Sequence, residues 1–329
     1  MEHIIQKHQL NESSIQLLNS YFKLSDLMIF DIETTGLSPT QSKVILIGFI
    51  TFDNDTAYVH QLFAPHTNNE IDILKAFIPY IKDKEVLINF NGSSFDIPYL
   101  NKRFQHHQLS TRIHSKKSFD LYRVSKSSKL PVENYKLKTL ETFLNIPRED
   151  TISGKESIHL YFKYMNSGDT DAKAKVLGHN FEDILHLIPF LKILEHFESS
   201  IINRYLPHRI NINGHTFYLD TTRIQKDYLT LTFSISNPED YKGMEIHNYE
   251  PATLILKKGI LEVQIPIFSI EVPEQGQYTF VDAEALGWIE DFNTLDYESK
   301  LIYLVKQQDM YLFDSIIECV RKVIYMCTQ

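Results

Sequence analysis

LMIFDIETTGLSP, residues 27–39, combines an apolar run with two closely spaced acids. An apolar run of this length that ends in a Thr-Thr-Gly turn is typical of a buried β-strand. Asp31 and Glu33 are two positions apart, so on a strand their side chains point to the same face. Two carboxylates on one face repel each other, and their pKa values rise unless cations neutralise them. Mg²⁺ and Mn²⁺, which prefer hard oxygen ligands, meet that requirement.

Two further stretches place carboxylates in similar positions. NFNGSSFDIPYL, residues 89–100, has Asp96 after a strand and a turn, at the start of a helix. HNFEDILHL, residues 179–187, has Asp183 within a helix and His179 one turn before it, so both side chains share a face. Each stretch alone is typical of a helix cap or a surface pair. The ordered combination with Asp-x-Glu indicates a metal site.

In this order, FDIETTGL, NFNGSSFDIPYL and HNFED resemble the three exonuclease motifs of the DEDD superfamily, whose fold is ribonuclease H-like. The segment SFDLYRV…LPVENYKLKTLETFLNI, residues 118–146, resembles the proofreading exonuclease domain of family B DNA polymerases. In its length and in the amino-acid sequence of these motifs, the chain resembles most the bacterial YprB-type ribonuclease-H-like family. The resemblance covers residues 27–195. It implies an α/β fold with a ribonuclease H-like mixed sheet flanked by helices.

The resemblance also implies a catalytic set and a cofactor. Two divalent ions, Mg²⁺ or Mn²⁺, would support two-metal hydrolysis of phosphodiester bonds at single-stranded ends, in the 3′→5′ direction. His179 stands at the spacing where the family has tyrosine, and a histidine of pKa about 6.5 can accept a proton from water. Asp120 is interpreted as a helix cap or a supporting acid outside the catalytic set. The implied metal ligands are Asp31, Glu33, Asp96 and Asp183, with His179 as the general base.

The expected nucleic-acid contacts come from the resemblance and from a basic stretch. The resemblance implies that Gly36 and Leu37 approach the terminal nucleotide. Residues 101–138 contain ten Lys/Arg and two acids, although the net charge of the chain is −9. Such a stretch can follow the phosphates of a single strand of DNA or RNA, or it can be an ordinary solvated surface. The expected basic contacts are Lys102, Arg103, Lys116, Lys117 and Arg123, with Phe104, Tyr122 or Tyr135 stacking on bases.

Composition excludes several classes of protein. The chain has 329 residues, 43% of them hydrophobic and 23% charged, which is typical of a globular protein. It has no apolar run of membrane-spanning length and no signal-peptide pattern, and it has only two cysteines, Cys319 and Cys327. We therefore expect a cytoplasmic protein that is not inserted in a membrane.

The pattern of apolar residues predicts three regions. Residues 1–26 are expected to be a helical lead, with a helix over about 10–24. Residues 27–198 are expected to be the ribonuclease H-like domain, which begins with an antiparallel meander and ends with a long helix over 171–198, kinked at Pro189. Residues 199–329 are expected to form a smaller β-rich domain with C-terminal helices over about 295–326.

Two alternatives to an exonuclease stay open. One is a ribonuclease H-like module that binds nucleic acid or protein with little turnover, and the other is a structure-selective endonuclease on the same scaffold. Residues 201–329 carry eleven basic and eighteen acidic residues. This excess of acidic residues favours binding of a protein partner, and not of nucleic acid, by the β-rich domain.

Overall fold

The computed structural model divides the chain into two compact units, Met1–Glu198 and Ser199–Gln329. All three acidic motifs lie in the first unit. The structure describes residues 1–127, 129–225, 227–248, 250, 252–274, 276–288, 300–306 and 310–328.

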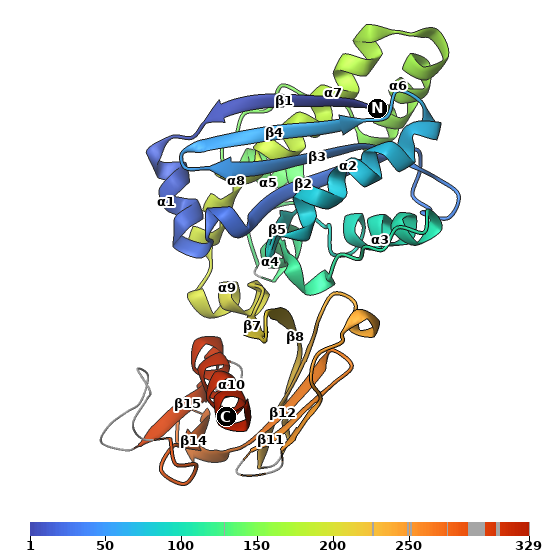
Figure 1. The fold of residues 1–329 in the computed structure, drawn as a ribbon. Helices are drawn as coiled ribbons and strands as arrows, with labels where there is room; N and C mark the ends of the chain where they lie inside the picture. The colour runs from blue at the N-terminus through green and yellow to red at the C-terminus, as the bar shows by residue number, and fades with distance from the viewer. Residues whose placement is uncertain are drawn as a thin grey trace. The chain divides into compact units, whose positions relative to one another are not determined.

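A six-stranded mixed sheet in the order β1-β4-β3-β2-β5-β6 forms the centre of the first unit (Figure 1). β2, β3 and β4 are the predicted antiparallel meander, and β1 adds to it antiparallel to β4. β5 and β6 extend the other side, parallel to β2. The predicted mixed sheet flanked by helices is therefore confirmed. The strands are β1 (Glu2–Gln9), β2 (Leu27–Thr34), β3 (Val44–Asp53), β4 (Thr56–Phe63), β5 (Val86–Asn89) and β6 (Ser118–Asp120).

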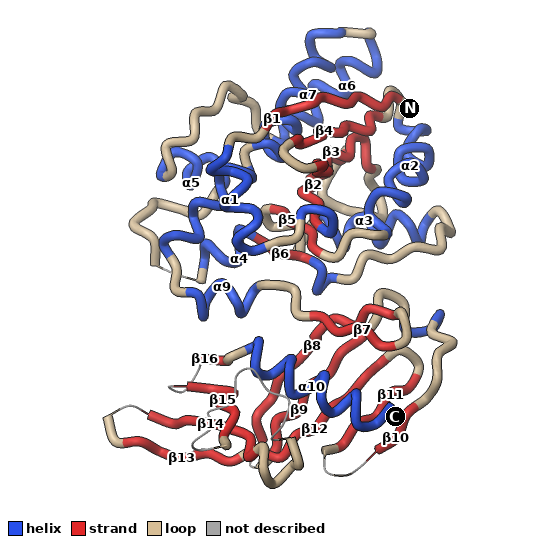
Figure 2. Tube along the Cα trace, turned by 60° about the vertical axis from the view of Figure 1, so that its left-hand side comes forward, coloured by secondary structure: helices blue, strands red, loops and turns tan. Residues whose placement is uncertain are grey.

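Helices cover both faces of this sheet (Figure 2). Met28 and Phe30 of β2 belong to the apolar layer under α2 and α3, where each buried large side chain contributes about 1.5–3 kcal/mol. Tyr161 of α6 and Val176 of α7 pack on the opposite face. Because side chains alternate along a strand, Asp31 and Glu33 face the α6 and α7 side. The helices are α1 (Glu12–Tyr21), α2 (Glu70–Lys82), α3 (Asp96–His106), α4 (Leu121–Lys126), α5 (Leu137–Phe143), α6 (Gly154–Ser167), α7 (Thr170–Leu185) and α8 (Leu187–Phe190).

The second unit is built mainly from antiparallel strands. One sheet has the order β10-β11-β12-β9-β8-β7 and the other the order β13-β14-β15-β16. Both sheets and α10 contribute to one apolar core around Trp288 and Phe217. Its elements are α9 (Ser199–Tyr205), β7 (Arg209–Ile212), β8 (His215–Gln225), β9 (Tyr228–Ser234), β10 (Ile246–Asn248), β11 (Thr253–Lys257), β12 (Ile260–Pro266), β13 (Phe268–Val272), β14 (Gly276–Asp282), β15 (Leu301–Lys306), β16 (Met310–Tyr311) and α10 (Phe313–Thr328).

Three expected helical regions need correction. The lead over 1–26 begins with an edge strand, β1, whose side chains are mostly exposed, so its sequence lacks the alternation that marks a half-buried strand. α7 ends at Leu185, because the ring of Pro189 clashes with the carbonyl four residues earlier. The C-terminal helix begins only at Phe313, since Leu301–Lys306 is a strand that buries Ile302 and Leu304. The first part of that expected helix, 295–299, lies outside the described residues.

None of the helices within the described ranges has the length and apolar content needed to cross a lipid bilayer.

Candidate metal and active site

Asp31 and Glu33 lie on β2 and are oriented by the two helices above it. Asn180 Nδ2 of α7 donates to Asp31 Oδ2 at 3.1 Å. Ser157 Oγ of α6 donates to Glu33 Oε2 at 2.9 Å. Both donors are uncharged, so they orient the carboxylates without neutralising them.

Asp96 is the first residue of α3 and contacts the same strand. Its Oδ1 accepts a hydrogen bond from the backbone N–H of Ile32 at 3.0 Å. The turn before α3 is held by Asp120, whose carboxylate accepts from the backbone N–H groups of Asn91 at 2.8 Å and Ser93 at 3.1 Å. Asp120 also caps α4, so it supports the position of Asp96 from outside the acidic cluster.

His179 and Asp183 lie one turn apart on α7 and face β2. His179 Nε2 is 3.7 Å from Glu33 Oε1 and 3.7 Å from Asp183 Oδ2. One ligand atom from each of these three residues lies within 4.8 Å of the others. The fold thus brings together the two carboxylates of β2 and the histidine–aspartate pair that the sequence singles out.

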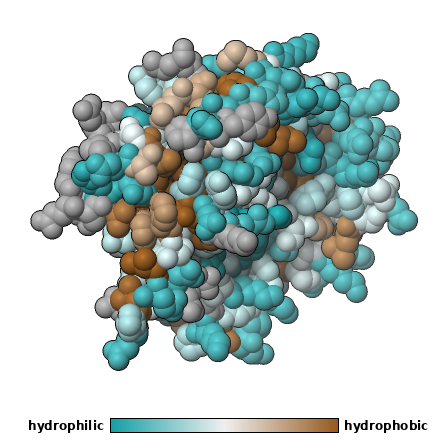
Figure 3. Space-filling view, turned by 90° about the horizontal axis from the view of Figure 1, so that it is seen from below, coloured by the Kyte–Doolittle hydropathy of each residue, from teal (hydrophilic) through white to brown (hydrophobic). Residues whose placement is uncertain are grey.

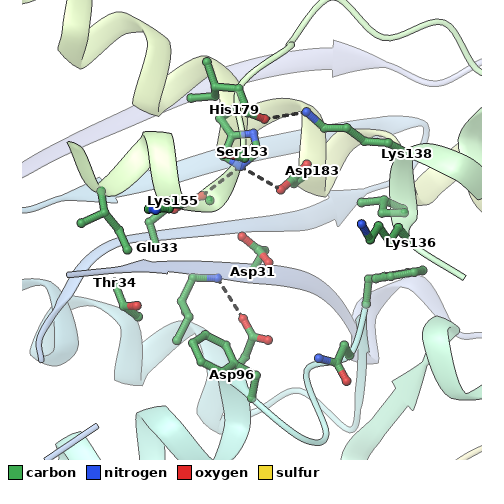
Figure 4. A pocket seen from close by; sticks show the side chains of 18 of the residues that line it. Asp31, Glu33, Thr34, Asp96, Lys136, Lys138, Ser153, Lys155, His179 and Asp183 are labelled. Carbon is green, nitrogen blue, oxygen red and sulfur yellow. Dashed lines mark hydrogen bonds and ion pairs between the residues drawn. The ribbon is translucent and has the colours of Figure 1, made fainter. Parts of the chain in front are cut away.

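These residues line one pocket of about 650 Å³ (Figure 4). Asp31, Asp96 and Asp183 point into it from a strand and two different helices. Lys136 and Lys138 come from the start of α5, and Lys155 from the start of α6 on the other side. The pocket therefore has an acidic floor and basic walls, an arrangement suited to a cation below and a phosphate above.

Burial and mutual repulsion raise the pKa values of the acids in the metal-free chain. Burial, and then the charge of Asp183, raise the pKa of Glu33 to about 7, although His179 lowers it. Burial raises the pKa of Asp96 to about 7 together with the charges of Asp120 and Asp183, against the hydrogen bond from Ile32. Burial, and then Asp96, raise the pKa of Asp31 well above its usual value. These acids ionise readily only beside added positive charge.

The residues present fit divalent metal. Carboxylate oxygens dominate the donor set, as Mg²⁺ and Mn²⁺ prefer, and rigid elements carry each donor. The hydrogen-bond donors to Asp31, Glu33 and Asp96 are uncharged, so a bound cation would supply the positive charge that these acids need in order to ionise. Asp183 differs, because the guanidinium of Arg148 forms an ion pair with it. Arg148 also binds Glu141 at 3.0 Å, which fixes the loop between α5 and α6.

Asp150 is a site residue that sequence reasoning missed. Its Oδ2 lies 2.7 Å from His179 Nδ1, and both side chains are more than nine-tenths buried. Burial would raise the pKa of Asp150, but the bond to His179 and further hydrogen bonds lower it to about 2. The Asp150 carboxylate therefore accepts a hydrogen bond from Nδ1, which turns Nε2 of His179 toward Glu33 and Asp183. Nothing in the local sequence around Asp150 marks it.

Of the expected nucleic-acid contacts, Leu37 lines the pocket and is 83% exposed. Gly36 lies beside it and packs against Ser42. A Cβ added at Gly36 would lie only 2.6 Å from the Oγ of Ser42. Lys102, Lys116 and Arg123 are not among the lining residues.

Three expected contacts are corrected by their burial. Arg103 is 2% exposed and binds Glu70 through two nitrogens at 2.7 and 2.6 Å. Lys117 is 8% exposed and donates to Lys84 O at 2.7 Å. Phe104 is fully buried in the core, so it cannot stack on a base. The presence of a basic or aromatic residue in the sequence does not show whether its side chain faces solvent or the core.

A second pocket of about 610 Å³ continues from the first, with Phe90 and Lys136 lining both. Tyr122, Tyr135 and Lys126 complete its aromatic and basic lining. The Tyr122 ring packs edge-on against Phe90, with centroids 5.6 Å apart, and Lys126 Nζ lies 5.6 Å from its centre. Two of the three expected stacking residues therefore lie next to the acidic pocket.

The first unit of the chain is similar in sequence to known proteins. A family model described as the RNase_H superfamily matches residues 28–195. An uncharacterized protein of Methanocaldococcus jannaschii is 30% identical over 173 residues, which cover 50% of this chain and 93% of that protein. The DNA polymerase of Thermococcus aggregans is 37% identical over 91 residues, which cover 23% of this chain and 5% of the polymerase. The structure of the family B DNA polymerase from Pyrobaculum calidifontis aligns with 71% of this chain and 39% of its own, at 15% identity and a TM-score of 0.39.

Proposed function

The chain belongs to the RNase_H superfamily, and we propose that it is a metal-dependent 3′→5′ exonuclease that hydrolyses phosphodiester bonds at single-stranded nucleic acid ends. The observation that carries the proposal is the convergence of Asp31, Glu33, Asp96 and Asp183 on one pocket beside His179. The chain spans only 5% of the length of the Thermococcus polymerase, so its own activity is inferred from its site. The YprB-type assignment is part of the proposal.

The four acids would hold two divalent ions, Mg²⁺ or Mn²⁺. Bound there, the ions supply Lewis-acid activation of the attacking water and neutralise charge that develops on the phosphate. The chain contributes the fixed ligand positions and lysines at the pocket wall for the phosphate oxygens.

His179 acts as the general base in this proposal. Asp150 accepts a hydrogen bond from the N–H of Nδ1, which leaves the lone pair of Nε2 facing Glu33 and Asp183. Nε2 takes a proton from the attacking water, the water oxygen bonds to phosphorus, and the 3′ oxygen of the preceding nucleotide leaves. Asp150 then stabilises the imidazolium that forms.

The single strand would enter along the second pocket. Tyr122 and Tyr135 offer aromatic faces to bases, and Lys126 and Lys136 can bind the phosphates. Leu37, exposed at the rim of the acidic pocket, would contact the terminal nucleotide together with Gly36. Lys102, Lys116 and Arg123 remain candidates for contacts farther along the strand.

The test is degradation of single-stranded DNA and RNA labelled at either the 3′ or the 5′ end, in Mg²⁺ and in Mn²⁺. The proposal is supported if nucleotides are lost one at a time from the 3′ end and this loss is absent in the Asp31→Ala, Glu33→Ala double variant. The same experiment shows whether the substrate is DNA or RNA. Cleavage of a strand blocked at both ends would instead indicate an endonuclease. Folded protein that binds the strand without cleaving it would indicate a binding module.

For residues 199–329, the proposal is a surface for a protein partner. Phe268 and Ile270 of the edge strand β13 are 53% and 46% exposed. The face drawn in Figure 3 shows hydrophobic groups in brown among hydrophilic ones. Together with the acidic balance of this region, exposed apolar residues favour protein over nucleic acid. A Phe268→Glu, Ile270→Lys variant should leave affinity for a single strand unchanged, and a loss of that affinity would contradict the assignment.

A further inference from the structure

Two buried amide side chains form a hydrogen-bonded row between α7 and the sheet. Asn180 of α7 is 0% exposed and Gln61 of β4 is 2% exposed. Gln61 Nε2 donates to Leu177 O at 2.8 Å and to Asn180 Oδ1 at 3.1 Å. Asn180 Nδ2 in turn donates to Asp31 Oδ2 at 3.1 Å. The row thus ends on a carboxylate of the acidic pocket.

The orientation of each amide follows from the groups at the two ends of the row. Leu177 O is a carbonyl oxygen that can only accept, so the end of the Gln61 amide that faces it is the NH₂ group. The same NH₂ group faces Asn180, which must therefore present its oxygen. The NH₂ group of Asn180 is left to face Asp31. The row consequently presents a donor, and not an acceptor, to the Asp31 carboxylate.

Gly48 of β3 leaves the space that this row occupies. In the sheet it is paired with Asp31 on β2 and with Gln61 on β4. A Cβ at this position would lie 2.0 Å from Asn180 Oδ1 and 2.8 Å from Asn180 Nδ2. A glycine inside a strand weakens the strand. Such a glycine often marks a position where another group approaches the backbone closely. Here that group is the Asn180 amide.

We propose that Asn180 is a positioning residue for Asp31, oriented by Gln61 and admitted by Gly48, and that it holds the Asp31 carboxylate for divalent cation. This inference rests on the metal site of the proposed function. Because the buried Asn180 donates to one oxygen of Asp31 at 3.1 Å, it restricts the carboxylate to one rotamer. Partners that orient a metal ligand typically change metal affinity by about 10–100-fold when they are removed.

The experiment measures binding of Mn²⁺ alone to the full-length protein, by electron paramagnetic resonance of the free ion. Asn180→Ala should weaken Mn²⁺ binding by about 10–100-fold. Asn101→Ala is the matched control, since Asn101 also makes two hydrogen bonds, with the backbone of Ile113 at 2.8 and 2.7 Å, but does not line the pocket. It should bind Mn²⁺ as the wild type does, whatever its effect on the melting temperature.

A second pair of variants tests the row without deleting the amide. Gly48→Ala should weaken Mn²⁺ binding as Asn180→Ala does, and it should add little to Asn180→Ala in the double variant. Gly178→Ala is its control, because a Cβ at Gly178, on the same helix, meets nothing within 4 Å.

The outcomes separate this inference from the one on which it rests. Loss of Mn²⁺ binding in Asp31→Asn, with wild-type affinity in both Asn180→Ala and Gly48→Ala, would overturn the role of Asn180 and leave the metal site intact. Absence of Mn²⁺ binding by the folded wild type would overturn the metal site and this inference with it.

Discussion

The two nitrogens of His179 face different partners, and that asymmetry determines its chemistry. Nδ1 lies 2.7 Å from the Asp150 carboxylate, while Nε2 faces two acids at 3.7 Å. A histidine four residues before an aspartate is often an ordinary helix surface pair. The buried Asp150 distinguishes this one, because it accepts from Nδ1 and so turns Nε2 toward the pocket.

His179→Ala should lower the rate of strand cleavage by about 10²–10⁴-fold, the range over which a general base contributes. Asp150→Asn should give a smaller loss, since an asparagine oxygen can still accept from Nδ1 but no longer stabilises the imidazolium. Single-turnover rates at saturating Mg²⁺ measure both effects. His106→Ala, an exposed histidine of α3, is the control. A wild-type rate in His179→Ala would assign the proton transfer to another group.

The raised pKa values of the acids predict how stability depends on pH. Glu33 and Asp96 have a pKa of about 7 in the folded metal-free chain, above their usual values. Between those usual values and about 7, the folded state binds more protons than the unfolded state, so their contribution to stability falls as pH rises. In EDTA, Asp96→Asn should therefore melt above the wild type at pH 8 and close to it at pH 5. Mg²⁺ should raise the melting temperature of the wild type more at pH 8 than at pH 5. An Asp96→Asn melting temperature below that of the wild type at pH 8 would contradict this account.

At individual positions, the sequence indicates the proposed metal ligands but not the groups that hold them. Asp31, Glu33 and Asp96 stand out because a carboxylate at the end of an apolar run is unusual. Asn180 and Ser157 do not, since they act on residues 149 and 124 positions away. Arg103 and Lys117 show the opposite error, because charge alone suggested an exposed surface. Only the fold shows which residues face each other.

α2 and α3 are joined by a buried ion pair between Glu70 and Arg103, a residue that sequence reasoning assigned to nucleic acid. Arg103 binds Glu70 through Nε and Nη2, and its Nη1 donates to Pro39 O at 2.9 Å. The pair thereby links two helices to the loop that carries Leu37. Without Arg103, the buried Glu70 carboxylate would keep the backbone N–H of Val44 and the ring of His107, each at 2.8 Å, but it would lose its guanidinium partner.

Arg103→Met should lower the free energy of unfolding by about 3–5 kcal/mol, because Glu70 remains buried. Lys102→Met, at the adjacent exposed position, should change it by less than about 0.5 kcal/mol. Urea denaturation followed by circular dichroism compares the two variants. Equal stability of both would show that the Arg103–Glu70 pair does not hold these helices together.

α4 brings Tyr122 to the second pocket. If bases stack there, Tyr122→Ala should weaken binding of a single-stranded oligonucleotide by about 1–3 kcal/mol, whereas Tyr122→Phe should retain it. Fluorescence anisotropy with Ca²⁺ in place of Mg²⁺ would measure the affinity. Unchanged affinity in Tyr122→Ala would place the strand elsewhere.

Among the elements, those with strong periodicity were predictable. The meander of β2, β3 and β4 follows from apolar runs separated by short polar turns. β1 could not be predicted from apolar periodicity, because it buries few side chains and is held in the sheet by its pairing with β4. Leu301–Lys306 alternates correctly for a strand, but its position next to a long amphipathic helix concealed it.

In the molecule as a whole, the candidate chemistry is confined to one unit. The five residues proposed to be catalytic and the groups that orient them lie between residues 31 and 183, within Met1–Glu198. Residues 1–198 expressed alone should therefore fold, bind Mn²⁺ and cleave a short strand at a rate within about tenfold of the full chain. Thermal unfolding and Mn²⁺ titration of the fragment test this. A folded fragment without Mn²⁺ affinity would show that residues 199–329 complete the site.

The central claim is that the four converging acids hydrolyse nucleic acid with divalent metal. Its most direct test is the initial rate of nucleotide release from a single strand in Mg²⁺, by the wild type, Asp31→Asn, Asp96→Asn and Asp169→Asn. Asp169 caps α7 outside the pocket and Asn is an equally good cap, so it is the matched control. We predict that the wild type and Asp169→Asn release nucleotides equally fast, while the two site variants release none above buffer. Release that persists in Asp31→Asn and Asp96→Asn, or that is absent from the folded wild type, would contradict the claim.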